Sequence, residues 1–491
     1  MTSDYTKILE EIKTADDRLH AQFVEKLQVN YDLDRTLVSF QANKTKNGHR
    51  WYKFKEGFSS DLVRYVMHKF ALNSGRILDP FAGSGAALFT SSELGVDSVG
   101  IELLPSATEI IEVRQILRTV EARQMAEQIR RFRENLVWQR PGESKRFPHI
   151  RITRGAFPSE AEAELGRYMY EIERISDDNL GRILFFAALC ILEDVSYTRK
   201  DGQYLRWDHR SGRSMGKKPF HKGTIKSFTP AICAKLDQIA GDIYGDQLRF
   251  AELVGEQRSG EVQLLKGSCL DILPTLENES FNGIITSPPY CNRYDYTRTY
   301  ALELAMMGIG EEEIRTLRQA MLSCTVENRE KADLGEKIDL VHLNRSLDAF
   351  ESQELLGLIL KYLDLCRNEG LLNNNGIPRM VRNYFKELTV VIFECARLLK
   401  PGTPFVMVND NVRYQGINIP VDLILSEIAQ RAGFDTQVIW FLPIGKGNSS
   451  QQMRMHGREE LRKCVYVWSR QKDTNHADKS ETCWATLRFA T

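Results

Sequence analysis

The sequence predicts an α/β protein built on a mostly parallel sheet with helices on both faces. Residues 76–95, RILDPFAGSGAALFTSSELG, combine a short apolar run, a glycine-rich turn and an alanine-rich helix, and DSVGIEL follows as a second short run. Further runs of this kind occur after residue 260, in VQLLKGSCLDIL and FNGIITSPPY. Strands that alternate with helices in this order are typical of a nucleotide-binding α/β fold.

Length and composition fit a soluble protein with more than one domain. The 491 residues are too many for one ordinary core, and the hydrophobic fraction of 42% and charged fraction of 27% are ordinary for globular proteins. The net charge of zero excludes a generally basic nucleic-acid binder but allows a local basic face. No apolar run approaches the roughly 20 residues that span a bilayer, and the N-terminus is charged. We therefore expect a soluble cytoplasmic protein.

The cysteines argue against disulfide bonds and metal sites. There are nine of them, which is an odd number, they are scattered, and no two have the CxxC spacing. Neither a disulfide framework nor a zinc site fits this distribution. We expect no metal.

Individual elements follow from periodicity and end signals. Apolar positions such as Ile8, Ile12 and Leu19 predict helix in the first 45 residues, and SSDLVRYVMHKFA reads as a helix with capping serines. Near the C-terminus, RNYFKELTVVIFECARLLKPG predicts a helix, PFVMVND a strand, VDLILSEIAQRAG a helix and CVYVWS a strand. The predicted organisation is a helical N-terminal segment (1–45), an α/β domain (46–115 and 260–470), an inserted helical and basic region expected to recognise the target (116–259), a second helical insertion (311–375) and a tail (471–491).

The segment DPFAGSG predicts a ligand-binding turn. It follows a strand that ends at Asp79, and Gly83 and Gly85 allow a ligand to approach the backbone closely. The free amides at the start of the next helix suit a carboxylate or a phosphate. An ordinary turn between a strand and a helix is the simpler alternative.

Two acidic residues are expected at neighbouring strand ends. Glu102 ends the strand after the glycine turn, where an acid accepts both hydroxyls of a ribose. Asp271, in GSCLDIL, is expected to end a third strand, where it accepts a hydrogen bond from an adenine amino group. A helix-capping role for Asp271 is about as plausible.

The segment TSPPY ends a fourth strand with an unusual combination of residues. Pro288 and Pro289 cannot continue a central strand, so the chain leaves the sheet in a rigid form. Ser287 Oγ and the Pro288 carbonyl then accept hydrogen bonds from one amine, which frees its lone pair to attack an activated methyl group. Tyr290 offers a ring on which a base stacks.

Together these motifs resemble the amino-group DNA methyltransferases, which use S-adenosylmethionine to methylate N4 of cytosine or N6 of adenine. The resemblance covers residues 46–110 and 260–470 and implies a Rossmann-like methyltransferase fold with a seven-stranded sheet, acting on double-stranded DNA. The catalytic residues that it implies are Ser287, Pro288, Pro289 and Tyr290. The cofactor-binding residues that it implies are Phe58, Ser60, Asp79, Pro80, Phe81, Gly83, Ser84, Gly85, Glu102, Asp271 and Ser287.

The first residue of the tetrapeptide bears on the target base. In this family it is Asp in most adenine enzymes and Ser in most cytosine-N4 enzymes, so Ser287 implies cytosine N4. The family also implies a cognate restriction endonuclease as partner. The alternatives are adenine N6, a methyltransferase acting on RNA or on a protein amide, and a non-catalytic DNA-binding protein. The intact tetrapeptide and glycine turn argue against the last.

DNA contacts are expected from a basic segment at 199–226, a long loop or β-ribbon. It holds nine Lys or Arg residues against two Asp residues, which gives a net charge of +7. Basic side chains contact phosphates, and aromatic side chains stack on bases. The candidates are Arg199, Lys200, Arg206, Trp207, Arg210, Arg213, Lys217 and Lys218, joined by Arg293, Tyr294 and Arg298 after the tetrapeptide. Asn409 or Asp410 is expected in the target-base pocket, and residues 445–463 form a further basic loop.

Overall fold

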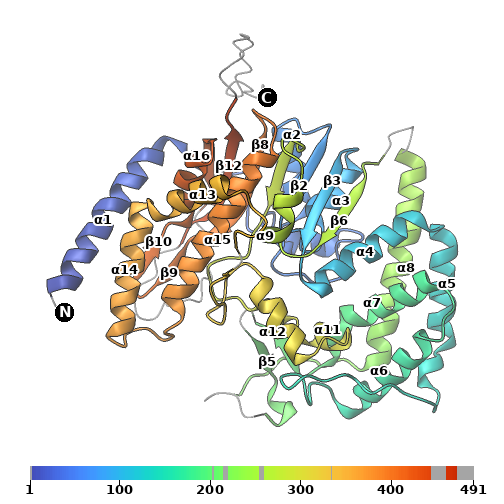
Figure 1. Cartoon of the computed structure of the whole chain (residues 1–491). Coiled ribbons are helices and arrows are strands. Elements are labelled where there is room, and N and C mark those ends of the chain that lie inside the picture. Colours follow the sequence, from blue (N-terminus) through green and yellow to red (C-terminus); the bar gives the residue numbers. More distant parts are fainter. Residues whose placement is uncertain are drawn as a thin grey trace.

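The computed structural model describes residues 3–201, 204–213, 219–253, 259–332, 334–443 and 461–472. A central sheet carries helices α1 and α13 to α16 on one side, and a separate group of helices, α5 to α8, lies beyond its other end (Figure 1). Among the described residues, no helix is long and apolar enough to cross a membrane.

The main sheet has eight strands in the order β1-β11-β12-β8-β7-β2-β3-β6. All neighbouring pairs are parallel except those of β12, which runs antiparallel to both β11 and β8. Two short hairpins, β4–β5 and β9–β10, lie outside the sheet. The strands are β1 (Leu27–Val29), β2 (Arg76–Asp79), β3 (Asp97–Glu102), β4 (Thr198–Lys200), β5 (Leu205–Trp207), β6 (Val262–Lys266), β7 (Gly283–Thr286), β8 (Pro404–Asp410), β9 (Val412–Tyr414), β10 (Ile417–Ile419), β11 (Phe434–Phe441) and β12 (Lys463–Arg470).

The sheet is buried on both faces because alternate strand residues enter different cores. Leu78 and Ile284 belong to the core that α1 and α13 to α16 cover, whereas Ile77 and Ile285 belong to the core that α2 and α3 cover. The helices are α1 (Ser3–Phe23), α2 (Ser60–Lys69), α3 (Ala86–Glu93), α4 (Pro105–Thr119), α5 (Ala122–Asn135), α6 (Ser159–Ile172), α7 (Asp178–Val195), α8 (Phe228–Leu253), α9 (Cys269–Ile272), α10 (Tyr296–Thr299), α11 (Ala301–Met306), α12 (Glu311–Ala320), α13 (Leu340–Glu351), α14 (Glu354–Asn368), α15 (Ile377–Leu398) and α16 (Val421–Arg431). Short 3₁₀ turns are η1 (Val24–Lys26), η2 (Phe40–Thr45), η3 (Val137–Gln139), η4 (His209–Ser211) and η5 (Leu273–Thr275).

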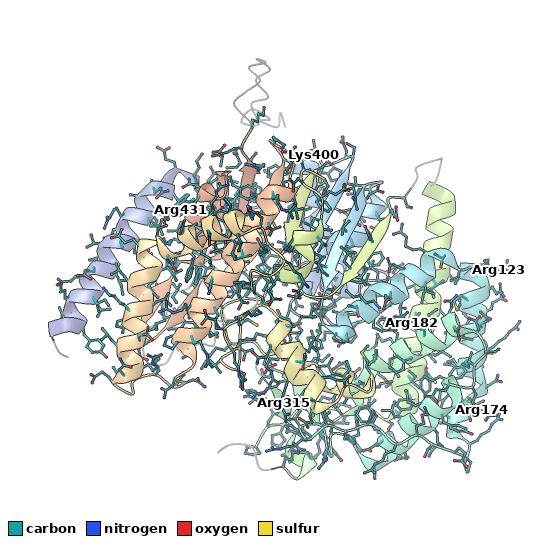
Figure 2. All side chains as sticks on the ribbon, viewed as in Figure 1. Arg123, Arg174, Arg182, Arg315, Lys400 and Arg431 are labelled. Atoms are coloured by element: carbon teal, nitrogen blue, oxygen red, sulfur yellow. The ribbon has the colours of Figure 1, made fainter. Side chains whose placement is uncertain are left out.

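The inserted region has a core of its own that also takes in parts of the α/β domain. This core joins α5 to α8 with one face of α4, with α11 and with aromatic residues from the segment before α2. Arg182 of α7, labelled in Figure 2, reinforces the junction by pairing with Glu109 and Glu112 of α4 at 2.7 and 2.5 Å. The inserted helices are therefore packed directly against the α/β domain.

Two expectations about the fold need correction. The sheet has eight strands instead of seven because the N-terminal segment, expected to be helical throughout, contributes β1 beside β11. The third strand does not reach Asp271, since β6 ends at Lys266 and Asp271 lies in the short helix α9. The second insertion is helical, as expected, and its helices α13 and α14 pack with α1 and α15 in the main core. The β-ribbon alternative for the basic segment is confirmed by the β4–β5 hairpin.

The packing of α1 predicts a contrast between two adjacent residues. Phe23 is 1% exposed in the main core, whereas Val24 is 52% exposed. Phe23→Ala should lower the free energy of unfolding by about 3–5 kcal/mol, because it leaves a cavity in a close-packed core. Val24→Ala is the matched control and should change it by less than about 0.5 kcal/mol in denaturant titrations. Equal effects would contradict the docking of α1.

Candidate active site

The carboxyl ends of five parallel strands meet at one edge of the sheet, where the following loops enclose a cavity. The strands β6, β3, β2, β7 and β8 are consecutive neighbours, and ligands bind at this edge in open α/β sheets. This cavity is called the first cavity below, and its walls include residues from the loops after β2, β3, β6 and β7. Its walls include the expected residues Phe58, Pro80, Phe81, Gly83, Ser84, Glu102, Ser287 and Pro289.

Gly83 lets the loop after β2 approach this cavity. Its φ of +54° lies in the left-handed region that favours glycine. A Cβ at this position would lie only 2.9 Å from Cε1 of Phe54, whose ring also lines the cavity. Backbone conformation and available space therefore both require glycine here.

Asp79 stabilises the loop after β2 through buried hydrogen bonds and does not line the cavity. Its carboxylate accepts hydrogen bonds from Thr286 Oγ1 at 2.6 Å and from the Phe81 amide at 3.1 Å. Burial raises the pKa of Asp79 to about 7, although both hydrogen bonds lower it. The residue thus links the end of β2 to the end of β7.

Glu102 lies in the cavity wall at the end of β3. Its carboxylate accepts hydrogen bonds from the amides of Gly83 at 2.6 Å, Leu103 at 2.9 Å and Leu104 at 2.7 Å. A carboxylate offers about four acceptor positions, so one remains for a ligand hydroxyl. Burial raises the pKa of Glu102 to about 7, and the three amides oppose that shift.

A second cavity adjoins the first across the tetrapeptide. It has an empty volume of about 910 Å³. Ser287 and Pro289 line the first cavity, whereas Pro288 and Tyr290 line the second. The second cavity is lined by Lys55, Glu56, Lys200, Asp201, Pro288, Tyr290, Asn292, Tyr294, Tyr296 and Asp410. The tetrapeptide therefore separates two adjacent cavities and contributes side chains to both.

The Ser287 hydroxyl is held at the boundary between the cavities. It donates a hydrogen bond to the Val408 carbonyl of β8 at 3.1 Å and lies 3.3 Å from the Tyr290 hydroxyl. Because a hydroxyl carries a single proton, donation to Val408 leaves its lone pairs free to accept. Burial raises the pKa of Tyr290, so its ring remains a neutral phenol.

Asp410 faces the second cavity from the end of β8. Its Oδ1 is buried without a hydrogen-bond partner within the described part of the chain, and Oδ2 lies 3.5 Å from Lys463 Nζ. Burial raises the pKa of Asp410, whereas Lys463 lowers it. The neighbouring Asn409 is committed elsewhere, because its amide donates to Tyr384. Asp410 is the one of the two expected alternatives that reaches the cavity.

Several expected cofactor residues do not line the first cavity. Ser60 is buried in the first turn of α2, and Gly85 supports the turn that starts α3. Asp271 points away because β6 ends earlier than expected, and its half-exposed carboxylate pairs with Lys337 at 3.1 Å. The loop after β6 reaches the cavity instead through residues 267–269.

Sequence reasoning missed Glu56, which lines both cavities together with Tyr296. Glu56 accepts hydrogen bonds from the hydroxyls of Tyr294 and Tyr300, so the tyrosines after the tetrapeptide form part of the wall. The family resemblance implies cofactor contacts at the nearby Phe58 and Ser60 but not at Glu56. No local sequence pattern indicates that Glu56 lines both cavities, because its partners Tyr294 and Tyr300 are far along the chain.

Most of the expected DNA-binding residues have partners within the protein. Lys200 and Trp207 are 6% and 5% exposed, so neither side chain lies on the open surface, although Lys200 lines the second cavity. Arg213 covers the Trp207 ring at 3.8 Å, and Arg210 pairs with Asp208 at 2.6 Å while its side chain remains 42% exposed. Other internal contacts are Arg206 with Asp201, Arg293 with Asn373, Tyr294 with Glu56, and Arg298 with Asp295 and Glu327.

Arg199 is exposed on β4 and remains a candidate for DNA contact. Lys217 and Lys218 lie outside the described residues, as does most of the basic loop at 445–463.

Comparison with known proteins shows similarity to type II methyltransferases over nearly the whole chain. The chain is 49% identical over 462 residues to the type II methyltransferase M.AvaI of Nostoc sp., and the match covers 94% of each protein. It is 38% identical over 481 residues to the type II methyltransferase M.BsoBI of Geobacillus stearothermophilus, covering 92% of this chain and 91% of the relative. No protein-family model and no solved structure matches the chain.

These similarities extend across the α/β domain and the inserted region alike, and they agree with the two cavities that meet at Ser287–Tyr290. The chain therefore belongs to the type II DNA methyltransferases of restriction–modification systems, which take their methyl group from S-adenosylmethionine.

Proposed function

We propose that this methyltransferase transfers a methyl group to N4 of a cytosine flipped out of duplex DNA, within a short specific sequence. A restriction endonuclease that cuts the same sequence is the partner that this activity implies. The observation that carries the proposal is the pair of cavities that meet at the tetrapeptide, together with the serine at its first position.

The first cavity suits S-adenosylmethionine. Glu102 offers an acceptor for a ribose hydroxyl, and Ile101, Leu104 and Leu322 provide apolar walls of the kind on which an adenine ring packs. Phe58 and Ser84 lie in the wall with Pro80 and are proposed to hold the methionine portion. When bound, the cofactor supplies an electrophilic methyl group on a positively charged sulfur.

The second cavity suits a flipped base. Ser287 Oγ and the Pro288 carbonyl are proposed to accept hydrogen bonds from the exocyclic amine, which turns its lone pair towards the first cavity. The single Ser287 proton has two acceptors within the protein, the Val408 carbonyl and the Tyr290 hydroxyl, so the Ser287 oxygen is prepared to accept. Tyr290 stacks on the ring, as bases do on aromatic side chains in base-flipping enzymes. Catalysis by this site is largely a matter of positioning.

Asp410 is proposed to contact the polar edge of the base. A buried oxygen without a partner is costly, and a base in the second cavity would satisfy it. The carboxyl group accepts a hydrogen bond when ionised and donates one when protonated. Either state would help to hold the base against Tyr290.

Cofactor binding should depend on pH through Glu102. Ribose hydroxyls donate to the ionised carboxylate, and the pKa of this group is raised to about 7, so affinity is full above pH 7 and falls as the pH decreases through 7. Glu102→Gln should weaken binding by roughly 10- to 100-fold, because it removes a charge-assisted hydrogen bond, and should abolish this dependence. Calorimetry between pH 5.5 and about 8.5 checks both results. A pH dependence that persists in Glu102→Gln would assign the titration to another group.

The methylated base can be identified directly. Duplex DNA incubated with the enzyme and labelled cofactor, then digested to nucleosides, should carry the label in N4-methylcytosine. Label in N6-methyladenine would overturn the base assignment, and label in RNA alone would overturn the substrate class.

The variant Tyr290→Ala tests the proposed stacking role of the tyrosine ring. It removes the stacking ring from the second cavity but leaves the first cavity intact, so the transfer rate should fall by at least about 10-fold with little change in cofactor affinity. Equal losses of transfer and cofactor binding would contradict the proposed role of the ring.

The exposed face of the β4–β5 hairpin is proposed to contact DNA phosphates through Arg199. Arg199→Ala should reduce the slope of log affinity against log salt by about 0.9, the value for one lost phosphate contact. Arg174, exposed at the outer end of the inserted region in Figure 2, provides the control, and Arg174→Ala should leave the slope unchanged. Fluorescence anisotropy at several salt concentrations measures both variants, and an unchanged slope for Arg199→Ala would exclude the contact.

A further inference from the structure

Lys200 is buried in a polar cluster instead of facing solvent. Its Nζ lies 2.5 Å from Glu303 Oε1 and donates a hydrogen bond to the Tyr52 hydroxyl at 2.9 Å. The side chains of Lys200 and Glu303 are only 5% and 1% exposed. The ammonium also lies 4.6 Å from the ring centre of Tyr52 and 4.5 Å from that of Tyr300. These four residues are called the Lys200 cluster below.

The Lys200 cluster joins three segments that are far apart in the sequence. Lys200 ends β4 of the basic hairpin, Glu303 belongs to α11 downstream of the tetrapeptide, and Tyr52 precedes α2. A second bond strengthens the junction, since Lys55 Nζ donates to the Lys200 carbonyl at 2.6 Å. The hairpin is therefore held to the wall of the active site through Lys200.

The cluster continues into the walls of both cavities. Tyr300 stacks on Phe54 at 5.5 Å with an interplanar angle of 14°, and Phe54 lines the first cavity. The Tyr300 hydroxyl donates to Glu56, which lines both cavities. Lys200 itself lines the second cavity. A displacement of β4 would therefore move Tyr300, and with it the residues that shape the first cavity.

An ion pair buried this deeply is an inefficient source of stability, because both charges lose their hydration. Its geometry is specific, however, and it fixes the distance between the hairpin and α11. Oε2 of Glu303 has no hydrogen-bond partner among the described residues, so hydrogen bonds do not fully offset the lost hydration of this carboxylate. These features indicate a positioning role more than a stabilising one.

We propose that Lys200 is a positioning residue that couples duplex binding at the β4–β5 hairpin to cofactor binding in the first cavity. The proposal rests on the proposed contact between this hairpin and DNA. Coupling of this kind is reciprocal, so duplex and cofactor each raise the affinity of the other by the same factor.

The test measures cofactor-site affinity with and without a duplex that contains the target sequence. S-adenosylhomocysteine serves as the probe because it lacks the reactive methyl group, so the result does not depend on which base is methylated. In the unmodified enzyme, the duplex should strengthen probe binding by on the order of tenfold. In the double variant Lys200→Met with Glu303→Gln, that factor should fall below about twofold.

The double variant is used because Lys200→Met alone would leave the Glu303 carboxylate buried without its cation. Lys226→Met is the matched control: Lys226 lies in the same basic segment but pairs with Asp194 at 2.7 Å on the surface, away from both cavities. It removes one positive charge and should leave the coupling factor unchanged. A folded double variant that keeps the coupling of the unmodified enzyme would overturn the proposal, as would an unmodified enzyme without coupling.

A second measurement needs no substitution. In hydrogen–deuterium exchange of the unmodified enzyme, duplex alone should slow amide exchange in residues 300–303, which do not line the second cavity. Protection confined to the hairpin would also overturn the proposal. Failure of the cytosine assignment would show only in the nucleoside products, so the two hypotheses are tested separately.

Discussion

The buried hydrogen bond between Thr286 and Asp79 joins the two strand ends on which the active site depends. Asp79 ends β2 and Thr286 ends β7, and the two strands are neighbours in the sheet. Both residues are almost fully buried, so water does not compete for the bond. Because the glycine turn follows Asp79 and the tetrapeptide follows Thr286, this contact sets the distance between the glycine turn and Ser287.

The tetrapeptide makes a single short segment serve two cavities. Its prolines hold the chain rigid just beyond the sheet, with Pro289 in the wall of the first cavity and Pro288 in the wall of the second. Methyl transfer requires the methyl donor and the acceptor amine to lie next to each other. A tetrapeptide that lines both cavities places the two sites side by side. The tyrosines that follow build the wall through Glu56, which explains their number near the tetrapeptide.

The basic segment illustrates why the charge of a sequence differs from the charge that a surface presents. Its net charge of +7 predicted a DNA-contacting loop, yet Lys200, Arg210 and Lys226 are committed to acidic partners within the protein. Those partners come largely from other elements, such as Glu303 on α11. Counting charges along the chain cannot identify such pairs, because they form only when α7, α11 and the hairpin pack together.

The sequence by itself determined the features that depend on local stereochemistry. Gly83 allows a left-handed backbone, Pro288 and Pro289 end a strand, and short continuous apolar runs specify β2, β3, β7 and β8. Tertiary structure alone decided that β1 joins the sheet, that β6 ends before Asp271, and that Glu56 and Asp410 enter the second cavity. The physical reason is that strand pairing, burial and ion pairing depend on residues distant in the chain, whereas turns and strand ends depend on their neighbours.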